Sequence, residues 1–237
     1  MILPVSFYSR PTLKVLEDLI GKVLVKKSKE GLTSGVIVEA EAYTGEDDPP
    51  SYAFRGRTKK SEIMYGPPGR AFVHFALGLH HMLNLVTEKE GWPAAILVRA
   101  LEPREGISLM KKRRKTEDLF NLCSGPAKIC EAFAIDRSLH GVSLFSSRSP
   151  LFIKEGEKRE KQERKAEEEI GQKGERRKEK ERKEETERRE EREETGEGER
   201  RKEEREELIW TSRIGIGEGK ERLWRAYLKG SPFISAK

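Results

Sequence analysis

Cysteine and long apolar runs are both scarce in this chain of 237 residues. The two cysteines, Cys123 and Cys130, match neither a disulfide framework nor a common zinc pattern, and we interpret them as core thiols of an intracellular protein. No apolar run approaches the roughly 20 residues that span a bilayer. Residues 1–5 lack the charged and apolar segments of a secretion signal, so we expect a cytoplasmic protein without a membrane partner.

Histidine is rare as well, and it does not indicate a metal site. His74, His80 and His81 are close in sequence, but adjacent histidines on a strand point to opposite faces of the sheet. We therefore expect no metal, and no other cofactor is indicated.

Charge, in contrast, is abundant and unevenly distributed. Residues 154–207 contain 20 Lys and Arg and 23 Glu, so they cannot bury a core, and we expect a low-complexity insertion that is helical in part or disordered. The remaining residues carry 28 Lys and Arg against 19 Asp and Glu, a net charge of +9. This excess favours a polyanionic partner, either nucleic acid or an anionic membrane surface.

Hydrophobic periodicity predicts an α+β fold with one mixed domain, residues 1–153 and 208–237, because strand-like alternation resumes after the insertion. A helix is expected to begin at Pro11 with an apolar stripe of Leu13, Leu16 and Ile20, and another to begin at 124–126. The expected strands are 22–25, 37–43, two within 71–86 that meet at a turn near 77–78, 95–101, 213–217 and 224–228.

The strand 37–43 has two unlike faces. Its apolar residues alternate with Glu39, Glu41 and Tyr43, which places two carboxylates roughly 6.6 Å apart beside an aromatic ring. Such carboxylates can activate water or stabilise a positive charge. The alternative is that they form the solvated face of an ordinary antiparallel strand.

Three further features suggest contacts with nucleic acid. The long polar loop Thr44–Gly69 combines aromatic residues with cations, among them Arg55, Arg57 and Lys59, although a solvated loop would have the same composition. Leu77, at the tip of the expected hairpin, is either a packing residue or a wedge that separates base pairs. Arg99, the only charge in its strand, must pair with a carboxylate or a phosphate.

Seven sequence blocks, in order, resemble the alkyladenine (3-methyladenine) DNA glycosylase family of the mammalian type. They extend over nearly all of the chain outside the charged insertion. The blocks are VEAEAY at 38–43, MYGPPG at 64–69, MLN at 82–84, VRALEP at 98–103, LCSGP at 122–126, RIG at 213–215 and KGSPF at 229–233.

The resemblance implies a single domain with a curved, mainly antiparallel sheet flanked by helices. It also implies a monomeric, metal-free, monofunctional glycosylase whose partner is double-stranded DNA containing damaged purines. Such an enzyme flips the damaged purine out of the duplex and hydrolyses its N-glycosidic bond, which starts base excision repair. A prokaryotic, nucleoid-associated protein fits this reading.

The resemblance also implies roles for individual residues. Glu41 matches the general base that activates water, and Arg99 matches a residue that helps hold this water. Tyr43 matches a wall of the base pocket and Asn84 a residue of its floor that discourages undamaged guanine. Ile214 matches an apolar contact at the rim.

The sequence departs from the commonest family pattern at three positions. Tyr52 stands where many relatives have histidine, and His74 stands where many have tyrosine. Both remain flat rings that can stack on a flipped base. Leu77 stands where many relatives insert a tyrosine into the DNA, so the strength of flipping and the range of lesions do not carry over.

Three functions remain open on the sequence alone. The first is excision of alkylated or deaminated purines, including 3-methyladenine, 7-methylguanine and hypoxanthine. The second is a non-catalytic module that binds nucleic acid through the same basic face. The third, a carbohydrate hydrolase that uses Glu39 and Glu41, fits the spacing of the carboxylates but not the cationic surface.

Overall fold

The computed structural model describes residues 1–76, 78–156 and 207–235. These residues belong to one compact unit, Met1–Gly156 with Glu206–Lys237. A second unit, Glu157–Arg205, lies outside the described residues, and so does nearly all of the expected insertion 154–207 with its charge pairs. Leu77 lies outside them as well.

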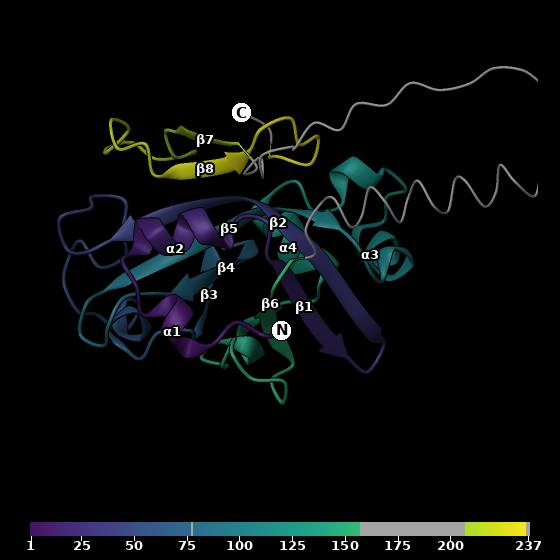
Figure 1. Cartoon of the computed structure of the whole chain (residues 1–237), viewed down its shortest axis with the longest axis horizontal. Helices are drawn as coiled ribbons and strands as arrows, with labels where there is room; N and C mark the ends of the chain where they lie inside the picture. The colour runs from purple at the N-terminus through teal and green to yellow at the C-terminus, as the bar shows by residue number, and fades with distance from the viewer. Residues whose placement is uncertain (77, 157–206, 236–237) are drawn as a thin grey trace, which may run out of the picture. The chain divides into compact units, whose positions relative to one another are not determined.

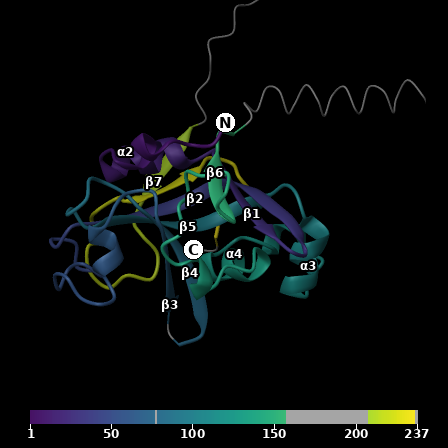
Figure 2. The same cartoon turned by 90° about the horizontal axis from the view of Figure 1, so that it is seen from below.

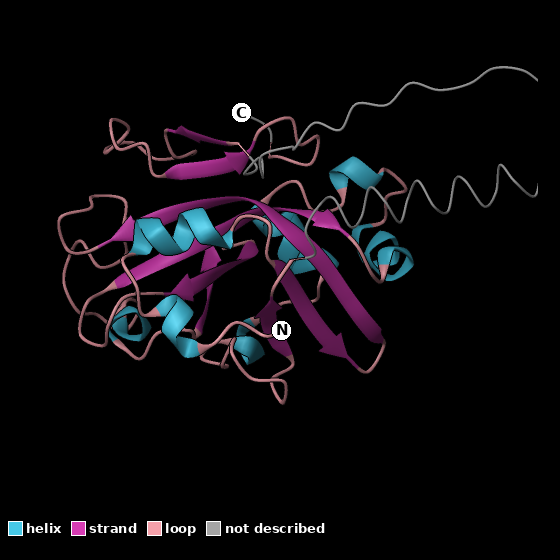
Figure 3. Ribbon diagram, in the orientation of Figure 1, coloured by secondary structure: helices cyan, strands magenta, loops and turns pink. Residues whose placement is uncertain are grey.

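Within the described ranges the chain has the mixed α+β composition that the periodicity predicts (Figure 3). The helices are α1 (Val5–Tyr8), α2 (Thr12–Leu19), α3 (Ile107–Arg114) and α4 (Pro126–Ala132), with short 3-10 turns η1 (Glu62–Tyr65), η2 (Leu119–Asn121) and η3 (Arg137–Leu139). The strands are β1 (Val23–Ser28), β2 (Gly31–Thr44), β3 (Ala71–Ala76), β4 (His80–Val86), β5 (Ala94–Pro103), β6 (Leu151–Lys154), β7 (Leu208–Thr211) and β8 (Arg225–Leu228).

The strands of the described residues form one eight-stranded, antiparallel sheet. Six of them follow the order β3-β4-β5-β2-β1-β6, and the other two, β7 and β8, pair with each other. β2 is long enough to have two neighbours along one edge, since its first half pairs with β1 and residues 39–41 pair with β8. The C-terminal strand β8 therefore lies beside β2, more than 180 residues away in sequence, and β7 pairs with β8 (both yellow in Figure 1). This sheet confirms the curved antiparallel fold.

One face of the sheet packs into the main hydrophobic core. Helix α2 contacts β2 and β5, and α4 contacts β4 and β5. The apolar residues of β2 that alternate with the acids, Val38, Ala40 and Ala42, have no exposed surface and belong to this core. Full burial of a side chain such as Val38 contributes about 1.5–3 kcal/mol.

The opposite face carries the polar residues and a second, smaller core. Phe72, Val86 and Ala95 lie on this face and pack against Ala53 and Met64 of the loop that follows β2. The expected polar loop 44–69 is therefore not an open loop. It includes η1 and covers part of the sheet face on which Glu41 lies.

The ladder between β2 and β5 shifts its register twice next to Glu39. Val38 of β2 and Arg99 of β5 consequently have no directly opposed residue across this ladder. Such irregularities redirect a side chain away from the regular pleat. Here Arg99 points toward the two acids of β2, with its guanidinium within ion-pair distance of both.

Helix α2 is present where expected, and two residues of the expected stripe, Leu16 and Ile20, are buried. The third, Leu13, is 37% exposed, and Thr12 is buried instead. The Thr12 hydroxyl lies 2.9 Å from Thr87 Oγ1, which holds this residue against the rest of the fold. The expected hairpin within 71–86 and the helix that begins near 124–126 are both confirmed.

Candidate active site

A row of directly opposed residues crosses the sheet and places the candidate residues on one face. Glu41 of β2 lies between Arg225 of β8 and Leu97 of β5, and Leu97 is followed by Asn84 of β4 and Phe72 of β3. Opposed residues in a ladder point to the same face. With adjacent strands about 4.8 Å apart, Glu41 and Asn84 are separated by about 10 Å, and Leu97 lies between them on the same face.

Glu41 is fully buried, so the solvated-face interpretation of this strand is wrong. Its Oε1 accepts a hydrogen bond from the Ile214 amide (2.7 Å) and lies 3.2 Å from Arg99 Nη1. Its Oε2 accepts a hydrogen bond from the Tyr43 hydroxyl (2.8 Å). A buried carboxylate requires such partners, because an unpaired charge would be costly in the protein interior.

Glu39 is buried as deeply, but it has more partners. Its Oε1 accepts from Arg99 Nε (3.0 Å), Arg225 Nε (2.7 Å) and the Ser235 hydroxyl (2.7 Å), and its Oε2 accepts from the Ser235 amide (2.5 Å). The expected pairing of Arg99 with a carboxylate is confirmed, and it involves both acids. Glu39 is thus an ion-pair residue that connects β5, β8 and the C-terminal segment.

The buried charges of this region balance. The acids are Glu39, Glu41 and Asp48, and the cations are Arg99, Arg213 and Arg225; each residue is at most 8% exposed. Removal of one partner from such a set costs about 3–5 kcal/mol, because a buried charge is left uncompensated. The network therefore constrains the geometry of every member.

The expected strand 213–217 is wrong, because Arg213 leaves the sheet to bind Asp48. Its Nη1 and Nη2 donate to the two carboxylate oxygens of Asp48 at 2.7 Å each, and Nη1 also donates to Ala42 O (2.9 Å). Gly215 then takes a positive φ of 74°, which breaks any extended run. The actual strand of this region is β7, which ends at Thr211.

Tyr43 is held as a hydrogen-bond donor. Burial raises the pKa of its hydroxyl well above the ordinary value, and the neighbouring Glu41 carboxylate raises it further. Its ring also lies 4.8 Å from the Arg213 guanidinium, in a cation–π contact. The phenol therefore stays protonated and keeps donating to Glu41 throughout the neutral pH range.

The rings of Tyr52 and His74, both expected in the base pocket, lie together on the same sheet face as Phe72. The ring centroids of Tyr52 and His74 are 4.8 Å apart in an edge-to-face contact. Burial, followed by the charges of Lys60, Arg137 and His140, lowers the pKa of His74 from 6.5 to about 4. The imidazole is therefore neutral at pH 7.

Asn84 determines which nitrogen of His74 carries the proton. Its Nδ2 donates to Phe72 O (3.1 Å) and lies 3.0 Å from His74 Nδ1. Since an amide NH₂ group only donates, Nδ1 accepts and the His74 proton is on Nε2. No described residue donates to Asn84 Oδ1, so this oxygen remains an acceptor for a ligand.

The expected DNA-contact residues lie at the surface. Arg55, Arg57 and Lys59 are exposed in the loop after β2, and Arg57 pairs with Glu62 at 3.1 Å. Figure 2 shows the β3–β4 hairpin extending beyond the neighbouring strands. Its described end carries two exposed apolar residues that sequence reasoning missed, Phe75 (44%) and Leu79 (72%).

Sequence reasoning also missed four residues of the buried network. Asp48, Arg213, Arg225 and Ser235 were not assigned to the site, although Arg213 stands in a block of the resemblance. The available signal was charge within an apolar context, which had identified Arg99. Arg225, which follows Trp224 and precedes an apolar strand, has the same signature.

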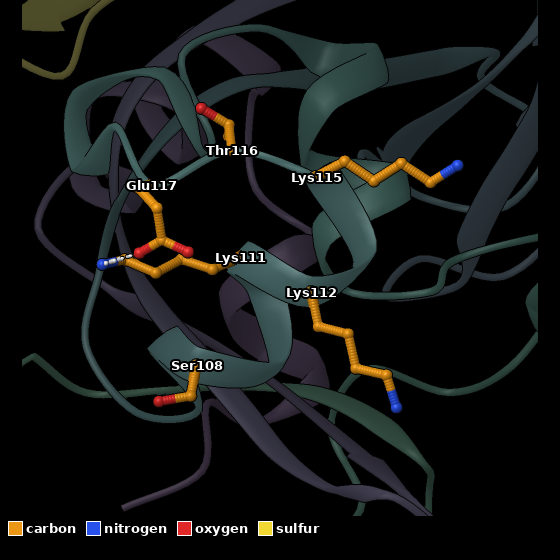
Figure 4. A pocket seen from close by; sticks show the side chains of 6 residues that line it. All are labelled: Ser108, Lys111, Lys112, Lys115, Thr116 and Glu117. Carbon is orange, nitrogen blue, oxygen red and sulfur yellow. Dashed lines mark hydrogen bonds and ion pairs between the residues drawn. The ribbon is translucent and has the colours of Figure 1, made fainter.

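The most basic run of the chain does not form a focused anion site. A hollow of about 510 Å³ beside α3 is lined by Ser108, Lys111, Lys112, Lys115, Thr116 and Glu117. Lys111 meets Glu117 at 2.9 Å, whereas Lys112 and Lys115 point away from that pair and from each other (Figure 4). The diverging ammonium groups favour a solvated helix face.

No group of three or more His, Cys, Asp or Glu residues in residues 1–76, 78–156 and 207–235 is arranged to hold a metal ion. In the same part of the chain no helix combines the length and apolar character that crossing a membrane requires. Cys123 and Cys130 are buried free thiols, and burial raises the pKa of each to about 12.

Comparison with known proteins agrees with the blocks identified in the sequence. Residues 6–182 match the family model described as methylpurine-DNA glycosylase. An assigned 3-methyladenine DNA glycosylase of Carboxydothermus hydrogenoformans is 36% identical over 237 residues, 100% of both chains. Another of Methanocella arvoryzae is 44% identical over 156 residues, which are 65% of this chain and 78% of the relative.

A third relative has the same assigned name. The protein of Prosthecochloris aestuarii is 45% identical over 152 residues, which are 64% of this chain and 72% of the relative. The family expected from the seven sequence blocks is thereby confirmed. The chain belongs to the methylpurine-DNA glycosylase family and is a DNA glycosylase, a hydrolase of base excision repair.

Proposed function

We propose that this protein removes alkylated purines from duplex DNA, with Glu41 as the base that activates the attacking water. The observation that supports this role is the number of donors around each acid. A carboxylate offers about four acceptor positions. Among the described residues Glu39 accepts from four donors, two on arginines and two on Ser235, whereas Glu41 accepts from three, and its Oε2 accepts from the Tyr43 hydroxyl alone, so we assign the water to this oxygen.

The chemistry then requires little beyond an ionised acid and a held water. The water oxygen bonds to the sugar C1′, the C1′–N bond breaks with its electron pair going to the purine, and the water proton passes to Glu41. An alkylated purine carries a positive charge and becomes neutral as it leaves. The Glu41 carboxylate also stabilises the oxocarbenium character that the sugar acquires, and Arg99 helps hold the water.

We assign the flipped base to the sheet face beside Glu41. We propose that Tyr43, Tyr52 and His74 stack against it, since stacking on an aromatic ring is worth about 1–3 kcal/mol per base. Asn84 Oδ1 and the His74 Nε2–H would then meet its edge as acceptor and donor. Ile214 would contact it at the rim. We expect 3-methyladenine and 7-methylguanine as substrates, and hypoxanthine as a further one.

Flipping and DNA binding are assigned to the exposed elements. Arg55, Arg57 and Lys59 would contact phosphates, and the hairpin end that includes Leu77 would enter the duplex where the base leaves. Leu77 itself lies outside the described residues, and the exposure of Leu79 on the same hairpin supports the role. We also propose a cytoplasmic monomer with residues 154–207 as a separate insertion; the relatives come from prokaryotes.

The experiment compares Glu41→Gln with the matched variant Glu39→Gln. In single-turnover assays on a duplex with one alkylated purine, Glu41→Gln should lose 10²-fold or more in base release, in the range of general-base catalysis. It should bind the uncleaved duplex as well as the original protein does. Glu39→Gln should mainly lose stability, by about 3–5 kcal/mol, because Arg99 and Arg225 lose their shared partner.

Full activity of a folded Glu41→Gln variant would refute the assignment of the base. If the unmodified protein binds DNA in a salt-sensitive manner but releases no base from any of a panel of purine lesions, a non-catalytic binding module would be the better description.

A further inference from the structure

We propose that Asp48 and Arg213 form a clamp that positions the donors of Glu41, and that they are positioning residues for base release. The inference rests on the proposed role of Glu41. Two of the three donors to Glu41 are the Ile214 amide and the Tyr43 hydroxyl. Arg213 of the clamp directly precedes Ile214 in the chain, and its guanidinium contacts the Tyr43 ring.

The Ile214 amide needs an anchor because regular structure does not hold it. Ile214 lies between β7, which ends at Thr211, and β8, which begins at Arg225. No ladder hydrogen bond fixes this part of the chain, and Gly215 follows with a positive φ of 74°. The position of the amide is therefore set by the side chain of its neighbour Arg213.

The hydrogen bonds of the Arg213 guanidinium fix both its distance from Asp48 and its orientation. The guanidinium donates two parallel hydrogen bonds to Asp48 at 2.7 Å, and a third to Ala42 O at 2.9 Å. The side chains of Asp48 and Arg213 have no exposed surface. A bidentate pair fixes the orientation of the guanidinium plane relative to the carboxylate plane, whereas a lysine ammonium acts as a point charge and fixes only a distance.

The same guanidinium supports Tyr43 from the side. Its centre lies 4.8 Å from the Tyr43 ring centroid and 5.1 Å from the Trp224 ring. The ring is thus confined between β2 and the segment after β7, with its hydroxyl directed at Glu41 Oε2. Asp48 is in turn tied to the end of β2, since its Oδ2 accepts from the Thr44 amide at 3.2 Å.

The clamp therefore links the segment that carries one donor to the strand that carries the acid and the other donor. Loss of the clamp should displace the Ile214 amide and free the Tyr43 ring without removing any group that touches the DNA. A displacement of about 1 Å in such an arrangement can reduce the rate of chemistry about 10²-fold.

The test measures single-turnover base release and the affinity for uncleaved duplex in parallel. Arg213→Lys and Asp48→Asn should each lose about 10²-fold in the release rate while the dissociation constant changes by less than about threefold. Arg213→Lys keeps the buried charge balanced and covers the case in which Asp48→Asn does not fold. Arg222→Lys is the matched control, because Arg222 stacks on the same Trp224 ring (4.6 Å) and approaches Asp48 only at 3.8 Å, without forming the bidentate pair. Its release rate should stay within about threefold.

A double-mutant comparison separates positioning from general destabilisation. In the Tyr43→Phe background, Arg213→Lys should reduce the rate of base release by a clearly smaller factor than in the original protein. The reason is that one of the two donors that Arg213 positions has already been removed. Equal losses in both backgrounds would overturn the inference, and so would a folded Arg213→Lys variant with a normal release rate. An original protein that releases no base would overturn the proposed function and this inference together.

Discussion

His74 is kept neutral by burial, and the hydrogen bond to Asn84 requires the neutral ring. The folded-state pKa of about 4 lies below the ordinary value of 6.5. The unfolded chain therefore takes up a proton at His74 as the pH falls below 6.5. The folded protein takes up this proton only near pH 4. The contribution of His74 to stability is complete above pH 6.5 and is lost as the pH falls through this window.

We expect this loss to amount to about 3 kcal/mol between pH 6.5 and pH 4, from about 1.4 kcal/mol for each unit of pKa difference. The measurement is the free energy of unfolding in urea at a series of pH values. His74→Gln should flatten the curve in this window, whereas His80→Gln, at an exposed histidine of the same hairpin, should leave it unchanged. Parallel curves for the original protein and His74→Gln would contradict the assignment.

At the scale of elements, the β3–β4 hairpin combines exposure with apolar character at its described end. Phe75 and Leu79 are exposed and contribute little to the core. Replacing both by serine should therefore change the free energy of unfolding by less than about 1 kcal/mol, as is usual for surface substitutions. Affinity for a lesion-containing duplex should fall by about 1–3 kcal/mol, the size of stacking contributions.

The control for the hairpin variant is Leu13→Ser. Leu13 is an exposed residue of α2, the helix that contacts β2 and β5. It should leave both stability and affinity nearly unchanged. If the hairpin variant and the original protein bind the lesion duplex with equal affinity, the hairpin does not enter the DNA.

Local patterns predicted the elements but not their partners. Alternation located β2 and identified its apolar face, and the turn near Gly78 divided 71–86 into β3 and β4. Alternation could not show that Glu39 and Glu41 are buried, because the residues that neutralise them come from other strands and loops. Arg225 and Ser235 reach Glu39 across 186 and 196 positions of sequence.

The errors in the elements have the same origin. The residues 213–217 alternate as a strand does, but a contact with Asp48, 165 positions earlier, takes Arg213 out of the sheet. Leu13 belongs to a plausible apolar stripe, but Thr12 is buried in its place and contacts Thr87 and Glu88. In both cases a polar contact remote in sequence outweighs a local preference.

At the scale of the whole molecule, binding to DNA should depend strongly on salt. The slope of log K against log salt concentration falls by about 0.9 for each phosphate contact that is lost. Replacement of Arg55, Arg57 and Lys59 by alanine should therefore reduce the slope by up to about 2.7. The control removes the same charge at Lys29, Lys112 and Lys115, which are also exposed. Equal slopes for the two triple variants would contradict a specific role of the loop.

The distribution of the buried network along the chain has a consequence for biosynthesis. The acids of β2 leave the ribosome long before Ile214, Arg225 and Ser235, which are more than 170 positions later in the sequence. A nascent chain that stops before residue 213 contains Glu39 and Glu41 without most of their donors. Such a fragment has no stable place for the acids in its interior, so we expect a prematurely terminated product to lack glycosylase activity.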